Sequence, residues 1–400
     1  MKDDRLIPEV SLFRACSAGE TFDKVSPFLS RLGITRVASQ TGLDRVGIPV
    51  WCAYTPNAKS IVIAQGKGLD DASARTSAVM EGIERAVATQ PVCEVVTQSR
   101  AALHATHCAT HVLDCLLATR SLPIAPDEKI VWARGLNLND RSDIWLPFEA
   151  IAFDRTTIGP RFWLSSDGLA SGNTREEAIL HGLLERVERD ALALWTVTNI
   201  DSRFAARLDP DSLRDGELRE MLAKIDAADL QIALFDITSD LGISCISALL
   251  GPKRLHAHQF LRHVDITLGA GASHFPAVAA SRAISEAIQS RMTFIAGARD
   301  DLLPEAYKRP ADRAICQAFS MPATRSLDDM PALFANNTAD GLQTLVNYLS
   351  DHGIDELFSI DISPEWLPVH VAKVLAPQLE NPDGNRRQRF GHRALSRSLQ

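Results

Sequence analysis

The chain has 400 residues, of which 46% are hydrophobic and 23% are charged, and its formal net charge at pH 7 is −8. This composition is typical of a globular protein with enough residues for a large core. The acidic balance gives no general attraction to nucleic acid or to an anionic membrane surface, so neither is expected as a partner.

The first residues, Met1–Arg5, are charged and lead into no apolar segment. No stretch of about 18 apolar residues occurs in the chain, so we expect no secretory signal and no membrane span. The seven cysteines form no Cys-x-x-Cys pair, which is typical of a reducing compartment. These features predict a cytoplasmic protein.

Residues 1–35 are expected to form an N-terminal lead-in segment with one amphipathic helix over 21–32. Residues 36–395 are expected to form a single domain. This domain starts with two predicted strands, over 48–54 and 60–65, because both runs are rich in β-branched and aliphatic residues.

Three long helices are predicted in this domain. The first runs over 71–88 and follows a Gly-Lys-Gly segment that reads as a turn. The second begins after Thr174, which forms a capping-box pattern with Glu177, and reaches about residue 198. The third runs over 277–296.

The remaining segments have a less regular pattern. Strands are predicted over 144–148, 230–237 and 243–250, and a further strand within 256–269. The C-terminal residues predict helical and irregular structure and end in a basic tail over 386–397.

The first long helix carries Ser77, Glu81 and Glu84 at positions i, i+4 and i+7, which lie on one helix face. This face is otherwise mainly apolar, so we expect it to point into the protein. An unpaired buried carboxylate is costly, and these acids therefore need partners.

The second long helix repeats this arrangement with Glu185 and Glu188. Both helices contain the pattern Glu-x-x-Glu-Arg, which ends in Arg85 in the first helix and in Arg189 in the second. This echo suggests two similar helices that present carboxylates to one shared site.

The third long helix places Arg282 and Glu286 on one face. Glutamates from two helices suit Mg²⁺, which prefers oxygen ligands and keeps substrate phosphates among them. Arg282 offers a planar fork for phosphate oxygens, and Lys67 lies between two glycines, where a phosphate can approach the backbone. Together these residues predict a site for a triphosphate and its metal ions.

A plainer interpretation of the same residues also exists. Glu and Arg three or four positions apart are common as solvated pairs on helix surfaces. The chain has neither a GxxxxGK[ST] motif nor a strand-bound GxGxxG motif. Spacing alone therefore predicts only a candidate metal–nucleotide site.

Taken in order, the motifs resemble the YcaO family. The segments that carry the resemblance are TGLDRVGIPVWCAYTPN at 41–57, SAVMEGIER at 77–85, LLERVERDA at 183–191 and RAISEAIQSRMTFIAGARDD at 282–301. The resemblance covers about residues 35–310. It implies an α+β fold in which antiparallel sheets carry long helices that converge on a nucleotide, and it makes the domain a catalytic one.

The resemblance also implies roles for single residues. Arg85 is expected to hold the acids in place, and Arg282 and Glu286 are expected to be catalytic. The residues expected to bind Mg²⁺ are Glu81, Glu84, Glu185 and Glu188. Those expected to bind ATP are Lys67, Ser77, Glu81, Asn173, Arg189, Arg282 and Glu286.

The implied activity is ATP- and Mg²⁺-dependent phosphorylation of a peptide backbone amide oxygen. A sulfide nucleophile would give a thioamide, a neighbouring Cys, Ser or Thr side chain an azoline, and an amine an amidine. Thioamide formation is favoured over azoline formation for two reasons. No fused peptide-recruiting domain is visible, and Leu395–Gln400 lacks the proline-rich PxPxP ending of many azoline-forming relatives.

The implied partners are a precursor peptide or protein as substrate and a TfuA-type or other peptide-recruiting protein, and a homodimer is compatible with the family. Three other classes stay open: a non-catalytic peptide-binding scaffold with a relic ATP site, an ATP-dependent carboxylate–amine ligase, and a metallohydrolase without a nucleotide. ATP turnover, trapping of an acyl phosphate with hydroxylamine, and an ATP-dependent thermal shift would separate them.

Overall fold

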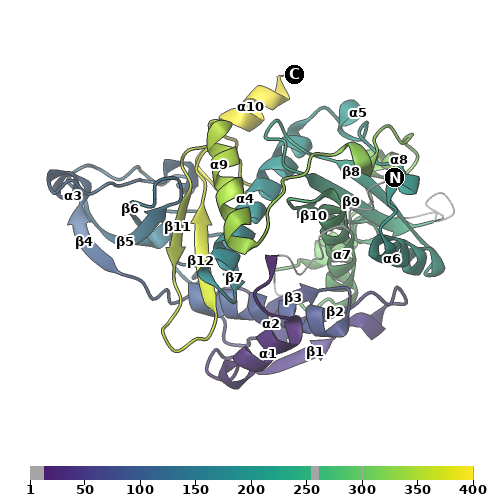
Figure 1. Ribbon diagram of the computed structural model, residues 1–400, viewed down its shortest axis with the longest axis horizontal. Helices are drawn as coiled ribbons and strands as arrows, with labels where there is room; N and C mark the ends of the chain where they lie inside the picture. Colours follow the sequence, from purple (N-terminus) through teal and green to yellow (C-terminus); the bar gives the residue numbers. More distant parts are fainter. Residues whose placement is uncertain (1–12, 254–260, 300, 400) are drawn as a thin grey trace.

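The computed structural model describes residues 13–253, 261–299 and 301–399. Within these residues the strands form three antiparallel sheets, and three long helices lie among them (Figure 1). The expected α+β class is therefore confirmed. In the described part of the chain, no helix has the length and apolar character needed to cross a membrane.

The sheets have the strand orders β1-β2-β3, β10-β9-β8 and β4-β5-β11-β12-β7, and β6 pairs with β5 at the side of the third sheet. The strands are β1 Arg36–Ser39, β2 Val50–Tyr54, β3 Ile63–Lys67, β4 Val95–Ser99, β5 Lys129–Asn137, β6 Asp143–Pro147, β7 Leu169–Gly172, β8 Leu230–Asp236, β9 Cys245–Pro252, β10 Thr267–Ala272, β11 Phe358–Asp361 and β12 His370–Leu375.

The three longest helices, α2, α4 and α7, follow strands β3, β7 and β10 along the chain. Each of them contacts two sheets: α2 the first and third, α4 the third and second, and α7 the second and first. The α-helices are α1 Ala18–Val25, α2 Asp71–Ala88, α3 Arg100–Ala105, α4 Arg175–Val197, α5 Ile200–Arg203, α6 Gly216–Ala227, α7 Pro276–Ala296, α8 Arg313–Ala318, α9 Thr338–Asp351 and α10 His392–Ser398.

The starts of the long helices agree with the sequence prediction. The Asp70 side chain accepts a hydrogen bond from the Ser73 backbone N–H and so caps α2. The Thr174 side chain accepts one from the Glu177 backbone N–H and caps α4. The Glu177 carboxylate accepts from the backbone N–H of Asn173. This bond is one residue before the position that a complete capping box requires.

The helix of the lead-in segment is shorter than predicted. The helix ends at Val25, although it was expected to continue to residue 32. In place of the continuation, a 3₁₀ turn lies at Ser26–Phe28 and further turns follow it. Pro27 explains this end, because proline has no backbone N–H with which to continue the helical hydrogen bonds.

The C-terminal region contains two strands that the sequence did not predict, β11 and β12, which lie inside the third sheet. Their residues are almost all buried, so they lack the alternation of polar and apolar residues that marks a half-exposed strand. The strand predicted within 256–269 begins only at Thr267, and residues 256–260 lie outside the described part of the chain.

Strands β3 and β10 lie very close to the helices that follow them. A Cβ atom on Gly66 would lie 2.0 Å from the backbone N of Ala78 in α2, and one on Gly269 would lie 2.2 Å from that of Ala287 in α7. Only glycine permits so close an approach. The predicted Gly-Lys-Gly turn is therefore wrong in part, because Gly66 and Lys67 pair with β2 as the end of β3.

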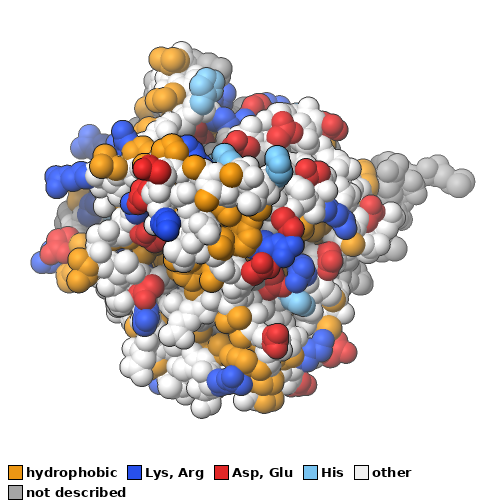
Figure 2. All heavy atoms as spheres, turned by 90° about the vertical axis from the view of Figure 1, so that its left-hand side faces the viewer, with side chains coloured by type: hydrophobic (Ala, Val, Ile, Leu, Met, Phe, Trp, Pro, Cys, Tyr) orange, Lys and Arg blue, Asp and Glu red, His pale blue; other side chains and the backbone are white. Residues whose placement is uncertain are grey.

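The outer strands of the third sheet are only partly covered. Figure 2 views the molecule from the side of β4, β5 and β6 and shows apolar side chains among charged ones. Val95 of β4 and Val131 of β5 are 49% and 41% exposed. These strands are therefore covered on one face only, because Trp132 of β5 and Leu146 of β6 are fully buried.

The close packing of β3 on α2 predicts a large effect of one methyl group. Gly66→Ala is expected to lower the free energy of unfolding by more than about 3 kcal/mol, because overpacking costs about 1–3 kcal/mol even where side chains can yield. Here the opposing atoms belong to the backbone. Thermal unfolding of the purified variant measures the loss.

The matched control is Gly19→Ala in α1, where a Cβ atom would have no neighbour within 4 Å. This control should be at least as stable as the unchanged protein, because alanine is favoured over glycine in a helix. Equal melting temperatures for the two variants would contradict the packing argument.

Candidate functional site

Carboxylates from α2 and α4 lie near each other where these helices converge. The Glu84 carboxylate of α2 accepts hydrogen bonds from the backbone N–H (2.9 Å) and hydroxyl (2.7 Å) of Ser171 in β7, directly before α4. Burial raises the pKa of Glu84 to about 8, and the charges of Glu81 and Glu185 add to this effect. The predicted acids therefore face a shared interior region.

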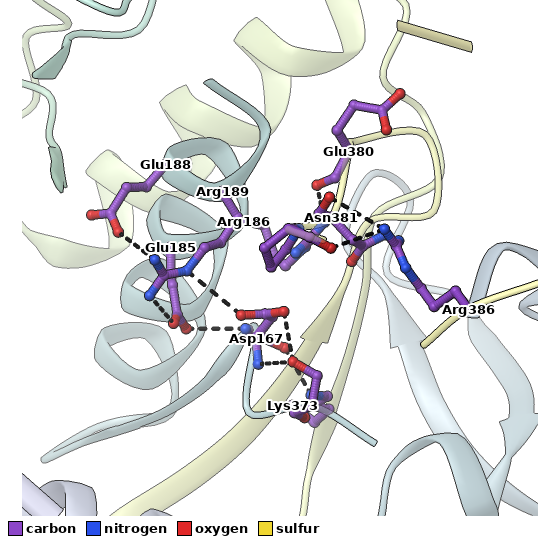
Figure 3. Close-up of polar contacts among 12 residues, drawn as sticks. Asp167, Glu185, Arg186, Glu188, Arg189, Lys373, Glu380, Asn381 and Arg386 are labelled. Carbon is purple, nitrogen blue, oxygen red and sulfur yellow. Dashed lines mark hydrogen bonds and ion pairs between the residues drawn. The ribbon is translucent and has the colours of Figure 1, made fainter. Parts of the chain in front are cut away.

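The first acid of α4 has a similar environment. Glu185 accepts a hydrogen bond from the Gly168 backbone N–H at 3.0 Å and pairs with Arg189 at 3.3 Å. Burial raises the pKa of Glu185 to about 7, and the charges of Asp167 and Glu188 act in the same direction against that of Arg189. Figure 3 shows the Arg189 guanidinium in contact with all three of these carboxylates.

Glu188 is the most deeply buried of the four predicted metal ligands, with 4% of its side chain exposed. Burial raises its pKa, and the charge of Glu286 raises it further, although Arg189, Arg282 and Lys67 favour the ionised form. Residues from α4, α7 and β3 therefore act on one carboxylate, as the sequence predicted for a convergent site.

A close ion pair joins β3 to α7. The Lys67 ammonium lies 2.5 Å from the Glu286 carboxylate, and both side chains are about three-quarters buried. Burial alone would raise the pKa of Glu286, but Lys67, Arg189 and Arg282 together hold it below its usual value. Glu286 is therefore an ionised group that orients the basic side chains of the site.

Arg85 holds Glu81 as expected. Its guanidinium donates to the Glu81 carboxylate and to the Ile63 carbonyl, and the other Glu81 oxygen accepts from the Gln65 backbone N–H at 3.0 Å. Glu81 is thereby tied to β3. Ser77 lies one turn earlier on the same helix and is partly buried.

Asn173 lies at the junction of β7 and α4, where it joins them to the lead-in segment. Its side-chain amide donates to the Thr21 hydroxyl of α1 at 2.9 Å. This bond holds α1 against the residue before α4. A contact of Asn173 with nucleotide stays a prediction.

The lead-in segment also supplies a basic residue that the sequence did not indicate. The Arg14 guanidinium lies 2.8 Å from the Glu177 carboxylate and 3.4 Å from Nδ1 of His181. Burial lowers the pKa of His181 well below its usual value, and the charges of Arg14 and Arg282 lower it further. His181 is therefore a neutral imidazole, one helical turn before Glu185.

Two other residues missed by sequence reasoning lie beneath the α4 acids. Lys373 of β12 donates to the carbonyl oxygens of Ser165 and Asp167, each at 2.7 Å, and burial lowers its pKa to about 8. Asp167 contacts Arg189 through its side chain. Lys373 lies in no recognisable motif. Asp167 lies in the loop of small residues before the second long helix, to which the sequence resemblance extends, but no role was predicted for it.

The predicted basic tail contains α10, which lies against α4. Arg393 of α10 donates to both carboxylate oxygens of Asp190, at 2.9 and 3.0 Å, and Asp190 is fully buried. Arg386 is also buried and donates to three backbone carbonyls. The bonds of Arg393 brace the helix that carries Glu185 and Glu188, and those of Arg386 hold the loop before α10.

The carboxylates fit magnesium by donor chemistry. In the described residues, no group of three or more His, Cys, Asp or Glu side chains is placed to hold a metal ion. Mg²⁺ usually takes only one or two carboxylates and completes its shell with water and substrate phosphates. At Glu84 and Glu185, burial and like charges outweigh the compensating hydrogen bonds and the charge of Arg189, so both pKa values are raised. A bound cation would supply the missing positive charge.

The raised pKa of Glu84 predicts a pH dependence of stability. In the unfolded chain this carboxyl loses its proton near pH 4.5, but in the folded protein it loses it only near pH 8. The folded state therefore binds more protons between these values, and its stability falls as the pH rises through them. Glu84→Gln removes this penalty, so it should stabilise the metal-free protein at pH 8 and have little effect at pH 5.

One pKa unit corresponds to about 1.4 kcal/mol, and we expect a gain of about 1–3 kcal/mol at pH 8 after structural relaxation. Melting temperatures in the presence of a chelator, at pH 5 and pH 8, measure the effect. Glu94→Gln is the control, because Glu94 is 59% exposed and forms its ion pair with the exposed Arg134. A Glu84→Gln protein that is less stable at pH 8 than the unchanged protein would refute this account.

Sequence comparisons agree on one family. Residues 65–380 match a family model described as YcaO cyclodehydratase, ATP- and Mg²⁺-binding. A protein of Rhizobium leguminosarum bv. trifolii, named uncharacterized protein in tfuA 3′ region, is 34% identical over 392 residues, or 96% of this chain and 92% of that protein. An uncharacterized protein of Methanothermobacter thermautotrophicus is 31% identical over 381 residues, or 92% of this chain and 95% of that protein.

Solved structures share the fold. YcaO from Methanopyrus kandleri, bound with AMPPCP and Mg²⁺, has a TM-score of 0.74 at 23% identity, and the match covers 96% of this chain and 97% of that one. A heterocyclase in complex with substrate and cofactor has a TM-score of 0.75 at 20% identity and covers 92% of this chain, which spans 53% of that protein. The chain therefore belongs to the YcaO family, and its cofactors are ATP and Mg²⁺, as the sequence predicted.

Proposed function

We propose that the chain binds ATP with Mg²⁺ between α2, α4 and α7 and uses it to phosphorylate a backbone amide oxygen of a peptide or protein. The observation that carries this proposal is the group of buried carboxylates on α2 and α4, which repel one another and lie beside basic residues from β3 and α7. A scaffold with a relic site would not need to keep so costly an arrangement.

The residue roles proposed are those that the family resemblance implies. Glu81, Glu84, Glu185 and Glu188 are the proposed Mg²⁺ ligands. Lys67, Ser77, Asn173, Arg189, Arg282 and Glu286 are the proposed contacts to ATP, with Glu81 beside them. Arg282 and Glu286 are the proposed catalytic residues, because the first can stabilise charge on the transferred phosphoryl group and the second orients Lys67 and Arg189.

Magnesium in this site would neutralise phosphate charge. The protein holds the peptide so that a nucleophile can add to an amide carbon. The resulting oxyanion attacks the γ-phosphorus of ATP, and ADP leaves. The basic side chains of Lys67, Arg189 and Arg282 then act on the negative charge that spreads over the phosphoryl oxygens. The phosphorylated oxygen departs as phosphate, and the nucleophile stays on the carbon.

Thioamide formation is the reaction that we favour. Its support is the relative in a tfuA 3′ region, which is 34% identical over almost the whole chain. That relative also supports a TfuA-type partner, although another peptide-recruiting protein would serve. The family description and the heterocyclase structure favour the alternative, an azoline-forming cyclodehydratase that acts on Cys, Ser or Thr. The domain limits at residues 35 and 395, the homodimer and the cytoplasmic setting stay predictions.

The metal assignment predicts loss of nucleotide binding without loss of the fold. Glu84→Gln and Glu188→Gln should each weaken Mg²⁺-dependent binding of AMPPCP at least about tenfold, because each removes a charged ligand. Calorimetric titration with and without Mg²⁺ measures this, and ATP turnover should fall with it. Glu94→Gln serves again as the exposed control. Unchanged binding in both site variants would remove the metal assignment.

The reaction assignment predicts a characteristic mass change. A candidate substrate protein incubated with the enzyme, ATP, Mg²⁺ and sulfide should gain about 16 Da when sulfur replaces oxygen, whereas ring closure to an azoline would lose about 18 Da. Intact-mass spectrometry measures the change, and a reaction without ATP is the control. A loss of mass under these conditions would replace the favoured reaction by the alternative.

A further inference from the structure

A small pocket adjoins the site at Asp167. Its polar wall is formed by Cys115, Asp167, Arg186, Lys373 and Asn381, and apolar side chains such as that of Trp163 complete it. Within this pocket, the centre of a water-sized molecule can occupy a volume of about 20 Å³. One water needs about 10–15 Å³ on this measure, so the pocket has room for one small species.

Arg186 gives this pocket an unused positive group. The side chain is 3% exposed, and Nη2 donates to the Glu380 carbonyl at 2.7 Å. Its Nη1 is also buried and has no hydrogen-bond partner within the described ranges. A buried cationic donor without an acceptor is costly, so this atom of a pocket-lining residue can take a further acceptor.

Lys373 adds a second positive group. It is 4% exposed, and its ammonium donates to the carbonyls of Ser165 and Asp167, which leaves one of its three N–H groups for another acceptor. Figure 3 shows Lys373 next to Asp167.

The other groups of the pocket do not cancel this charge. The Asp167 carboxylate accepts a hydrogen bond from the Ser165 hydroxyl at 2.6 Å and lies 3.5 Å from Arg189. These two groups already compensate part of its negative charge. Burial raises the pKa of the Cys115 thiol to about 11, which keeps it neutral. The pocket is therefore positive, partly apolar and large enough for one small ligand.

We propose that this pocket binds one small, weakly hydrated anion, and that hydrosulfide is the anion it supplies to the amide carbon. This inference rests on the proposed function, because thioamide formation needs a sulfur nucleophile. Strongly hydrated anions would lose more hydration in a partly apolar pocket. A neutral molecule would leave Arg186 and Lys373 balanced only by Asp167, Glu185 and Asp190, carboxylates that other basic groups share.

The proposed step is balanced. The sulfur of HS⁻ forms a C–S bond with the amide carbon, and the carbonyl π electrons move to oxygen. This oxygen takes the γ-phosphoryl group from ATP, and ADP leaves. The S–H proton then passes to the departing phosphate as the C–O bond breaks and C=S forms, which gives a thioamide, ADP and HPO₄²⁻. No oxidant or reductant is required.

Bromide is the direct probe of the pocket, because it is a small, weakly hydrated anion that is visible by anomalous scattering. Crystals of the full chain soaked in sodium bromide should show a peak beside Nη1 of Arg186, and addition of sodium hydrosulfide should remove it. No peak at this position, or a peak that hydrosulfide does not displace, would overturn the inference. This test needs no variant, so it decides even if substitutions in the pocket prevent folding.

Kinetics test the role of the bound anion. Arg186→Met and Lys373→Met should each raise the KM for sulfide about tenfold or more and leave the KM for ATP within about twofold, since charge-assisted hydrogen bonds to the anion are lost. Arg207→Met is the matched control, because Arg207 also has a buried Nε without a partner in the described chain but does not line the pocket. Its KM for sulfide should not change.

The two proposals fail in different ways. A protein that makes no thioamide but binds bromide displaceably refutes the proposed reaction and supports the anion pocket. A protein that makes thioamide, lacks the bromide peak and has an unchanged KM for sulfide in both pocket variants refutes the pocket and leaves the proposed reaction standing.

Discussion

Carboxylates can be buried together only where positive charge or hydrogen bonds compensate them, and this constraint governs the centre of the molecule. Glu84 and Glu185 have raised pKa values because burial and like charges act on both. Arg189 lies among three carboxylates, and Lys67 neutralises Glu286. A bound cation with a phosphate group would compensate the remaining repulsion among these carboxylates. The buried carboxylates that destabilise the ligand-free protein are therefore the groups that would bind the proposed ligands.

The helices reach this centre through a repeated strand–helix unit. In each unit a strand leads directly into a long helix, and a glycine lets the two backbones approach: Gly66 for α2, Gly172 for α4 and Gly269 for α7. In the first two units, a helix carboxylate accepts a hydrogen bond from a backbone N–H in the strand or just before it. Glu81 accepts from Gln65, and Glu185 accepts from Gly168. The same local geometry therefore sets the direction of the acids in α2 and α4.

Residues far along the chain complete and brace this arrangement. Strand β12 supplies Lys373 beneath the α4 acids, and α10 supplies Arg393 for the buried Asp190. Glu380 is itself buried and accepts from the backbone N–H groups of Gly391 and Ala394, which fixes the start of α10. The C-terminal region is thus part of the wall around the acids, and it also encloses the small positive pocket beside them.

The sequence by itself determined the three long helices, the shared face of each acidic pair and the family, because helical spacing and motif order are local properties of the chain. It also indicated that Arg85 holds the acids of its helix in place, and Arg85 does pair with Glu81. Only the tertiary structure decided that Gly66 lies within a strand, that β11 and β12 form the inner part of a sheet, and that Asp167, Arg186 and Lys373 meet beside α4. These features depend on pairings between residues up to about two hundred positions apart, and no periodicity within one segment encodes such a distance.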